Sequence, residues 1–182
     1  DLATAGATVS VGEVRLQSFV HAGQNLGFVH INSDDCVFSI ENPRYGKPAK
    51  LTRATKLKSC ISMSLKNLHY PVAEKDECVL GDIGVQYFTQ QVSESLTYGI
   101  FLGVRKSEGT TTAVYTVGTG NDANTITQNA VRLIEGAIAQ GYAKSFEDHK
   151  AWWRKFWENS HLELEDKFFE KQWYLGNYLL GS

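Results

Sequence analysis

A glycine-rich motif is the feature of this 182-residue sequence most suggestive of chemistry. Residues 118–123, GTGNDA, fit the pattern G-x-G-x-x-A, which holds the pyrophosphate of a dinucleotide when it joins a parallel strand to a helix. The surrounding sequence argues against that role, because the strands predicted before the motif form an antiparallel meander and no parallel strand ending in an acidic residue follows it. We therefore interpret residues 118–123 as a turn followed by a helix N-cap, and we predict no cofactor.

The five histidines give little support to a metal site, because none of them forms an HxH or HExxH pair. His149 lies on the aromatic face of a predicted helix. We interpret it as a buried histidine hydrogen-bonded to a neighbouring strand or loop, since a catalytic role would need partners that the sequence does not supply. The other histidines are His21, His30, His69 and His161.

Carboxylates and nucleophiles do not form a recognisable catalytic set either. A pair of carboxylates could perform the acid and base steps of glycoside hydrolysis, but most of those present fall at predicted turns and caps, where a solvated charge is the ordinary outcome. No serine or cysteine has an adjacent base, and neither G-x-S-x-G nor a phosphate-binding loop occurs. We predict no catalytic residue and no metal ligand. The carboxylates considered are Asp34, Asp35, Glu74, Asp76, Glu77, Glu163, Glu165 and Asp166.

Aromatic side chains are the remaining candidates, because their flat faces can stack on sugar rings. All four tryptophans fall within residues 145–182. Residues 145–160 predict a helix with Ser145 as N-cap, completed by Asp148 as in a capping box. Since an aromatic helix face demands burial, we interpret one set of residues as the core of a linker packed against the preceding sheet. That set is His149, Trp153, Phe156 and Trp157.

The elements around these residues change type near residue 119. Alternating apolar residues and short turns at residues 93–94 and 107–109 predict an antiparallel β-sandwich in the first part of the chain, with a hairpin around residues 33–34 and a strand at 60–68. A helix follows, capped by Asp122 or Asn124 and ended by Gly141. For four aromatic residues on the predicted strands the sequence leaves two roles open, a place in the core or in a sugar-binding platform. These residues are Tyr87, Phe88, Tyr98 and Tyr115.

The last predicted helix follows Asp166, which can cap it, and is apolar on nearly every side. Phe169, Trp173 and Leu180 represent this pattern. A helix that is apolar all round is normally buried on all sides, so we interpret it as the first helix of a helical domain whose remainder lies outside this sequence. An uncovered helix of this kind seeks a partner, and we expect some self-association through it.

Composition restricts the class of protein. With 42% hydrophobic and 21% charged residues the chain is ordinary for a globular protein, and a net charge of -2 with a pI of about 6.2 argues against nucleic-acid binding. The sequence contains no run of about 18 apolar residues, so it predicts no membrane span. The sequence starts at Asp1, without an initiating Met and without a signal-peptide pattern, which indicates a mature or cut chain.

Three cysteines without CxxC spacing leave at least one free thiol, and the pairing of Cys36, Cys60 and Cys78 stays open.

The end of the chain resembles a known domain junction. The runs HKAWWRKFW at residues 149–157, LELED at 162–166 and WYLGNYLL at 173–180 resemble the linker of large bacterial glycoside hydrolases with an N-terminal β-sandwich and an (α/α)6 barrel. The inverting α-L-fucosidase-like group and its uncharacterised six-hairpin relatives match best. Residues 13–31 also resemble a strand pair of that sandwich domain.

This resemblance implies an α+β fold: a supersandwich-like antiparallel β-sandwich followed by C-terminal helices. Residues 1–118 would be the β-sandwich domain, incomplete at its N-terminus, 119–161 a helical linker, and 162–182 the first helix of a truncated helical (α/α) barrel domain. The acid and base of the family lie in the barrel, so no catalytic residue is transferred to this sequence.

The resemblance implies that the chain is a non-catalytic domain and linker in a secreted or periplasmic glycoside hydrolase. This domain would be inactive alone, and it would support the barrel and line the sugar cleft. Its expected partners are the missing C-terminal helical domain and an oligosaccharide, with no nucleic acid and no membrane. Two alternatives stay open. One is a carbohydrate-binding module without chemistry, which an exposed aromatic platform would favour. The other is an interaction or adhesion domain, which packing of the last helix against a second copy would favour.

Overall fold

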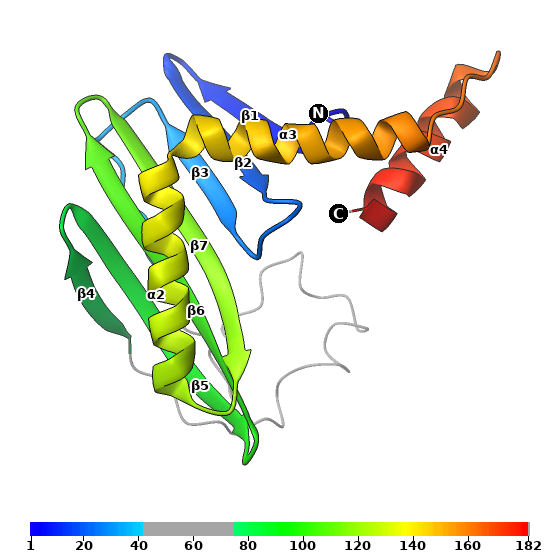
Figure 1. Ribbon diagram of the computed structural model, residues 1–182. Helices are drawn as coiled ribbons and strands as arrows, with labels where there is room; N and C mark the ends of the chain where they lie inside the picture. Colours follow the sequence, from blue (N-terminus) through cyan, green and yellow to red (C-terminus); the bar gives the residue numbers. More distant parts are fainter. Residues whose placement is uncertain (42–74, 182) are drawn as a thin grey trace, which may run out of the picture.

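The computed structural model describes residues 1–41 and 75–181, whose arrangement is shown in Figure 1. These ranges contain seven strands followed by three helices. The strand expected at residues 60–68 lies outside the described residues, as do Cys60, His69 and Glu74. The strands are β1 (Gly6–Val11), β2 (Val14–Val20), β3 (Gly27–Ile31), β4 (Asp76–Leu80), β5 (Ile83–Ser93), β6 (Leu96–Ser107) and β7 (Thr110–Gly120), and the helices are α2 (Ala123–Gln140), α3 (Tyr142–Asn159) and α4 (Lys167–Gly181).

The seven strands form one antiparallel sheet in the order β1-β2-β3-β7-β6-β5-β4. The predicted class is confirmed: the fold is α+β, with a sandwich-like antiparallel sheet followed by C-terminal helices. The predicted turns between β5 and β6 and between β6 and β7 are also confirmed. Gly12 and Gly109 make the tight turns after β1 and β6 with φ of 60° and 69°, values that disfavour residues with a Cβ.

One face of the sheet carries a row of apolar side chains in register across the strands. Phe19 of β2 lies opposite Phe28 of β3, and Phe28 lies opposite Val114 of β7. Because opposite residues of antiparallel strands point to the same face, these side chains form a continuous surface. A second cluster, which includes Phe88 and Leu102, lies on the opposite face. The sheet therefore buries apolar residues on both sides.

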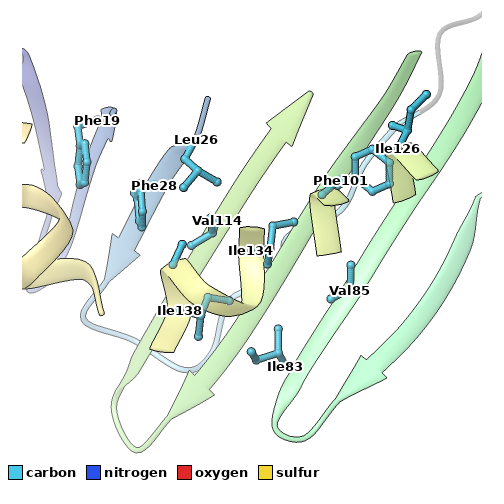
Figure 2. Packing of buried hydrophobic residues seen from close by; sticks show 12 residues of the cluster. Phe19, Leu26, Phe28, Ile83, Val85, Phe101, Val114, Ile126, Ile134 and Ile138 are labelled. Atoms are coloured by element: carbon cyan, nitrogen blue, oxygen red, sulfur yellow. The ribbon is translucent and has the colours of Figure 1, made fainter. Parts of the chain in front are cut away.

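Helix α2 covers the first of these faces, as Figures 1 and 2 show. Asp122 caps it by accepting a hydrogen bond from the backbone N–H of Thr125, which confirms one of the two predicted caps. Ile126, Ile134 and Ile138 lie on one side of α2 at helical spacing and are buried against the sheet. Burial of this stripe fixes α2 across the central strands.

Two glycines allow α2 to approach the sheet closely. A Cβ at Gly103 of β6 would lie 2.3 Å from Ile134 Cγ2, and a Cβ at Gly118 of β7 would lie 2.5 Å from Ile126 Cγ2. The isoleucine methyl groups therefore occupy the space that side chains at these positions would fill. Gly118, the first glycine of the GTGNDA motif, thus has a packing role that its sequence context did not indicate.

Replacing Gly136 by alanine is expected to raise the free energy of unfolding by about 0.5–1 kcal/mol. Gly136 lies inside α2 on its exposed side, and a Cβ there would meet no atom within 4 Å. The substitution therefore restricts the unfolded chain without a steric cost in the folded one. Urea unfolding of both proteins would measure the change, and a loss of stability in Gly136→Ala would contradict the open geometry.

Two expectations for local structure are wrong. Residues 36–41 form no strand, so the hairpin expected around residues 33–34 is absent and β3 pairs with β2 and β7 instead. Helix α3 begins at Tyr142, and Ser145 is a buried residue within it whose hydroxyl donates to the Gly141 carbonyl. Gly141 replaces Ser145 at the N-cap because its φ of 87° lets the chain end α2 and start α3 at one residue. Asp148 pairs with Lys144 rather than completing a capping box.

Candidate functional site

The GTGNDA motif lies at the end of β7 and the start of α2. Its strand is in an antiparallel sheet, where β7 lies between β3 and β6. Asp122 accepts hydrogen bonds from the backbone N–H and the hydroxyl of Thr125, and these bonds lower the pKa of its carboxyl. The motif thus supplies a helix cap and a close strand–helix contact. It lacks the parallel strand–helix arrangement that would hold a pyrophosphate.

His149 links three segments of the chain that are distant in sequence. Its side chain is fully buried, its Nδ1 accepts from the backbone N–H of Ala22 at 3.1 Å, and its Nε2 lies 2.8 Å from the Thr4 carbonyl oxygen. Since a carbonyl can only accept, Nε2 carries the hydrogen and the ring is neutral. Burial lowers the pKa of His149, which also favours the neutral ring. The residue therefore fastens α3 to the N-terminal segment and to the loop after β2.

The other linker residues form an aromatic column along α3. Trp153 is buried, whereas Phe156 and Trp157 are half-buried. The rings of Trp153 and Phe156 are 5.2 Å apart, and those of Trp153 and Trp157 are 5.9 Å apart. Trp157 also donates from Nε1 to the Leu2 carbonyl. The column thus contacts the N-terminal segment on one side and, through further rings, α4 on the other.

Helix α4 rests on this column by two tyrosines. The Tyr178 ring lies 5.4 Å from that of Trp153, and the Tyr174 ring lies 5.4 Å from that of Trp157. Asp166 caps α4 as expected, accepting from the backbone N–H groups of Phe168 and Phe169. No residue of α4 is buried. Trp173 is half-buried, and other large apolar residues are exposed: Phe168, Phe169, Leu175, Leu179 and Leu180.

A cavity of about 530 Å³ lies where β1, β2, the N-terminal segment and the end of α4 meet. Phe19, Trp153 and Tyr178 contribute aromatic walls, and Ser18 and His21 contribute polar groups. Among the described residues, two buried side-chain nitrogens have no hydrogen-bond partner, His21 Nε2 and Trp153 Nε1. Both belong to residues of this cavity wall. Sequence reasoning missed His21, because nothing in its local pattern points to a helix more than a hundred residues away.

The remaining candidates do not converge on one place. Asp76 accepts a hydrogen bond from the Tyr87 hydroxyl at the sheet edge, whereas Asp34 accepts from the backbone of Gly109 at a hairpin. No group of three potential ligands that could hold a metal ion occurs within residues 1–41 and 75–181. In the same ranges no helix is long and apolar enough to cross a membrane.

The strand aromatics differ in exposure. Phe88 is buried, Tyr87 and Tyr98 are half-buried, and Tyr115 is 39% exposed. Tyr115 covers Gly27, whose Cβ would fall 1.9 Å from the ring. Of these four residues, Tyr115 is both exposed to solvent and part of the cavity wall. Cys36 and Cys78 are free thiols.

Comparison with known proteins gives no assignment. No protein-family model matches the chain, and no curated protein matches it.

Proposed function

We propose that this chain is the non-catalytic β-domain and linker of a larger carbohydrate-active glycoside hydrolase. In this proposal the sheet and α2 form a scaffold, α3 is a fixed arm, and α4 is the contact element for a helical barrel domain of the same protein. The barrel would supply the acid and the base, and the β-domain would support it and line the sugar cleft.

The arm is suited to a supporting role because it is held at several points. His149 binds the N-terminal segment and the loop after β2, and Trp157 binds the Leu2 carbonyl. Gly141 joins α2 and α3 without an intervening loop. A helix fixed in this way can hold a second domain at a defined orientation.

The observation that carries the proposal is the exposed apolar side of α4. Phe168, Phe169 and Leu180 are 65%, 61% and 88% exposed on a helix whose tyrosines pack on α3. A contiguous exposed apolar surface marks an interaction site. Helix-on-helix packing is the ordinary way to bury such a surface, and the resemblance to a sandwich–barrel linker supports a helical domain as its partner.

Hydrolysis assays test the catalytic part of this proposal. The chain alone is expected to release no aryl group from a panel of aryl glycosides above the level of a mock preparation. The parent protein with its helical domain is expected to hydrolyse at least one of them. Turnover by this chain alone would overturn the assignment of a non-catalytic role.

Without its proposed partner, the chain is expected to self-associate through α4, and Phe169→Glu/Leu180→Glu should weaken that association at least tenfold. The reason is that glutamate carboxylates at these exposed positions cannot be desolvated cheaply against a second apolar surface. Sedimentation velocity over a range of protein concentrations would measure the effect. Lys171→Glu is the matched control, because Lys171 is an exposed polar residue of the same helix. Equal association of wild type and the double variant would exclude α4 as the contact.

A further inference from the structure

The cavity between β2 and the end of α4 combines two features that rarely occur together without a reason. Its wall is largely aromatic and apolar, and two of its residues, His21 and Trp153, carry the buried side-chain nitrogens that have no partner in the described part of the chain. Buried polar groups in native proteins are almost always hydrogen-bonded, and a buried donor without an acceptor costs about 1–3 kcal/mol. Both unpartnered nitrogens belong to wall residues of one cavity, so an acceptor entering that cavity would lie near both of them once the covering side chains adjust.

Both nitrogens are hydrogen-bond donors. The indole nitrogen of Trp153 can only donate. His21 Nδ1 accepts from the backbone N–H of Gly23 at 3.0 Å, so in the neutral ring the hydrogen is on Nε2. Burial lowers the pKa of His21, which favours this neutral form. A complementary ligand must therefore present oxygen acceptors to two uncharged N–H groups.

The charges near the cavity disfavour an anion. The Asp148 carboxylate is close enough to raise the pKa of His21 against the effect of burial, and Asp1 belongs to the cavity wall. Asp1 also carries the α-ammonium, which donates to the Gly6 carbonyl and offsets its carboxylate, so a negative charge on the ligand would meet the Asp148 carboxylate and no cation at the two donors. The ligand indicated by the wall is uncharged, rich in oxygen acceptors, and able to lie against flat aromatic rings.

We propose that this cavity binds one ring of a neutral sugar, whose oxygens accept hydrogen bonds from Trp153 Nε1 and His21 Nε2 and whose apolar face packs on Tyr178 or Tyr115. A volume of about 530 Å³ is within the range of small-molecule sites. Neighbouring atoms cover both nitrogens in this structure, so binding includes a side-chain adjustment of the kind common at ligand sites. The choice of a sugar over another neutral polyhydroxyl compound rests on the proposed function, whereas the two unpartnered donors do not depend on it.

The test follows the indole N–H signal of Trp153 in ¹H–¹⁵N correlation spectra, assigned with Trp153→Phe. Methyl glycosides of glucose, galactose and fucose are the probes, and acetate and inositol are the comparison compounds. At least one glycoside is expected to shift the Trp153 signal saturably at millimolar concentration. The indole signal of Trp152 is an internal control, because this neighbouring tryptophan does not belong to the cavity wall.

Two variants separate the site from a general effect on folding. Ser18→Phe fills the cavity while both donors remain, and it is expected to weaken binding at least tenfold. His21→Phe removes one donor and is expected to weaken it roughly five- to tenfold. His30→Phe is the matched control, because His30 is half-buried and bonded to Thr112 away from the cavity, and its binding should equal that of wild type.

The absence of any saturable glycoside shift, or equal shifts in wild type and Ser18→Phe, would overturn the site. A response to acetate without one to glycosides would overturn a neutral ligand, and a response to inositol equal to that for glycosides would overturn the choice of a sugar. These results are distinct from a failure of the proposed function, which shows as aryl-glycoside turnover by this chain whether or not the cavity binds sugar.

Discussion

Gly103→Ala is expected to lower the free energy of unfolding by about 2 kcal/mol, although alanine replaces glycine in a strand. The added Cβ would lie 2.3 Å from Ile134 Cγ2, a distance that real Cβ atoms do not adopt. Reduced freedom of the unfolded chain favours the alanine by about 0.4–1 kcal/mol, whereas overpacking costs about 1–3 kcal/mol. Overpacking is expected to dominate, because the clash involves the methyl group on the branched Cβ of a fully buried residue and not the far end of a flexible side chain.

Gly84→Ala is the matched control for this effect. Gly84 lies in β5, in the strand next to Gly103, and a Cβ there would meet no atom within 4 Å. It should therefore leave the stability unchanged or raise it by about 0.4–1 kcal/mol. Urea unfolding of both variants measures the comparison. Equal effects at the two positions would show that the close approach of α2 to β6 does not determine stability.

A double-mutant cycle identifies the clashing partner. Ile134→Ala alone should cost about 2–5 kcal/mol through the cavity that it leaves. In Gly103→Ala/Ile134→Ala the new methyl group enters part of that space, so the combined loss should be smaller than the sum of the two single losses. Strict additivity of the two losses would mean that the new methyl group at position 103 does not enter the space left by Ile134.

Local patterns in the sequence are sufficient for the meander of β5, β6 and β7 and for α2, whereas the pairing of β3 with β7 joins residues far apart in the sequence. Alternation, short turns and the Asp122 cap each depend on a few neighbouring residues, and the structure has all three. The start of α3 could not be found in this way. Ser145 has the side chain of a good cap, but the capping position is decided by Gly141, whose positive φ ends one helix and begins the next. Where two helices meet at one residue, the stronger local signal is misleading.

The candidate site depended on contacts that no local pattern contains. The aromatic face of α3 is readable from the spacing of His149 and Trp153. The atoms that His149 bonds are 127 and 145 residues away in sequence, in the loop after β2 and in the N-terminal segment. His21 likewise joins the site only because β2 ends beside α3. Long-range placement of this kind is set by the register of the sheet and by the angle between α2 and α3.

Acidification from pH 7 to pH 5 is expected to remove about 1–2 kcal/mol of unfolding free energy through His149 alone. Its neutral ring satisfies two backbone groups at once, by accepting at Nδ1 and donating at Nε2. Protonation would place a second N–H against the Ala22 N–H and would bury a charge. Burial is the main reason why the pKa of His149 is lowered, and the neighbouring His21 lowers it further.

The direction of the pH effect follows from that lowered pKa. The unfolded chain binds a proton near the ordinary histidine pKa of about 6.5, whereas the folded chain binds it only at lower pH. The stabilisation is therefore complete above about pH 6.5 and is lost as the pH falls toward the folded pKa. His21 adds to the effect in the same direction, since its pKa is lowered too, although the Asp148 carboxylate opposes the change. Hydrogen bonds from Lys144 lower the pKa of Asp148 itself, so its contribution is lost only at pH values below the range tested.

Urea unfolding of wild type and His149→Gln at pH 7 and pH 5 isolates the contribution of His149. Glutamine does not titrate, so the variant is less stable at pH 7 but should lose about 1–2 kcal/mol less than wild type between the two pH values. His161→Gln is the control, because it makes the same substitution at an exposed residue between α3 and α4, and its free energy of unfolding at pH 7 should equal that of wild type. If His149→Gln kept the full pH dependence, His149 would bind its proton equally well in the folded and unfolded chains. The two hydrogen bonds of the neutral ring would then not favour the folded state, and the attachment of α3 to the sheet would depend on the aromatic column instead.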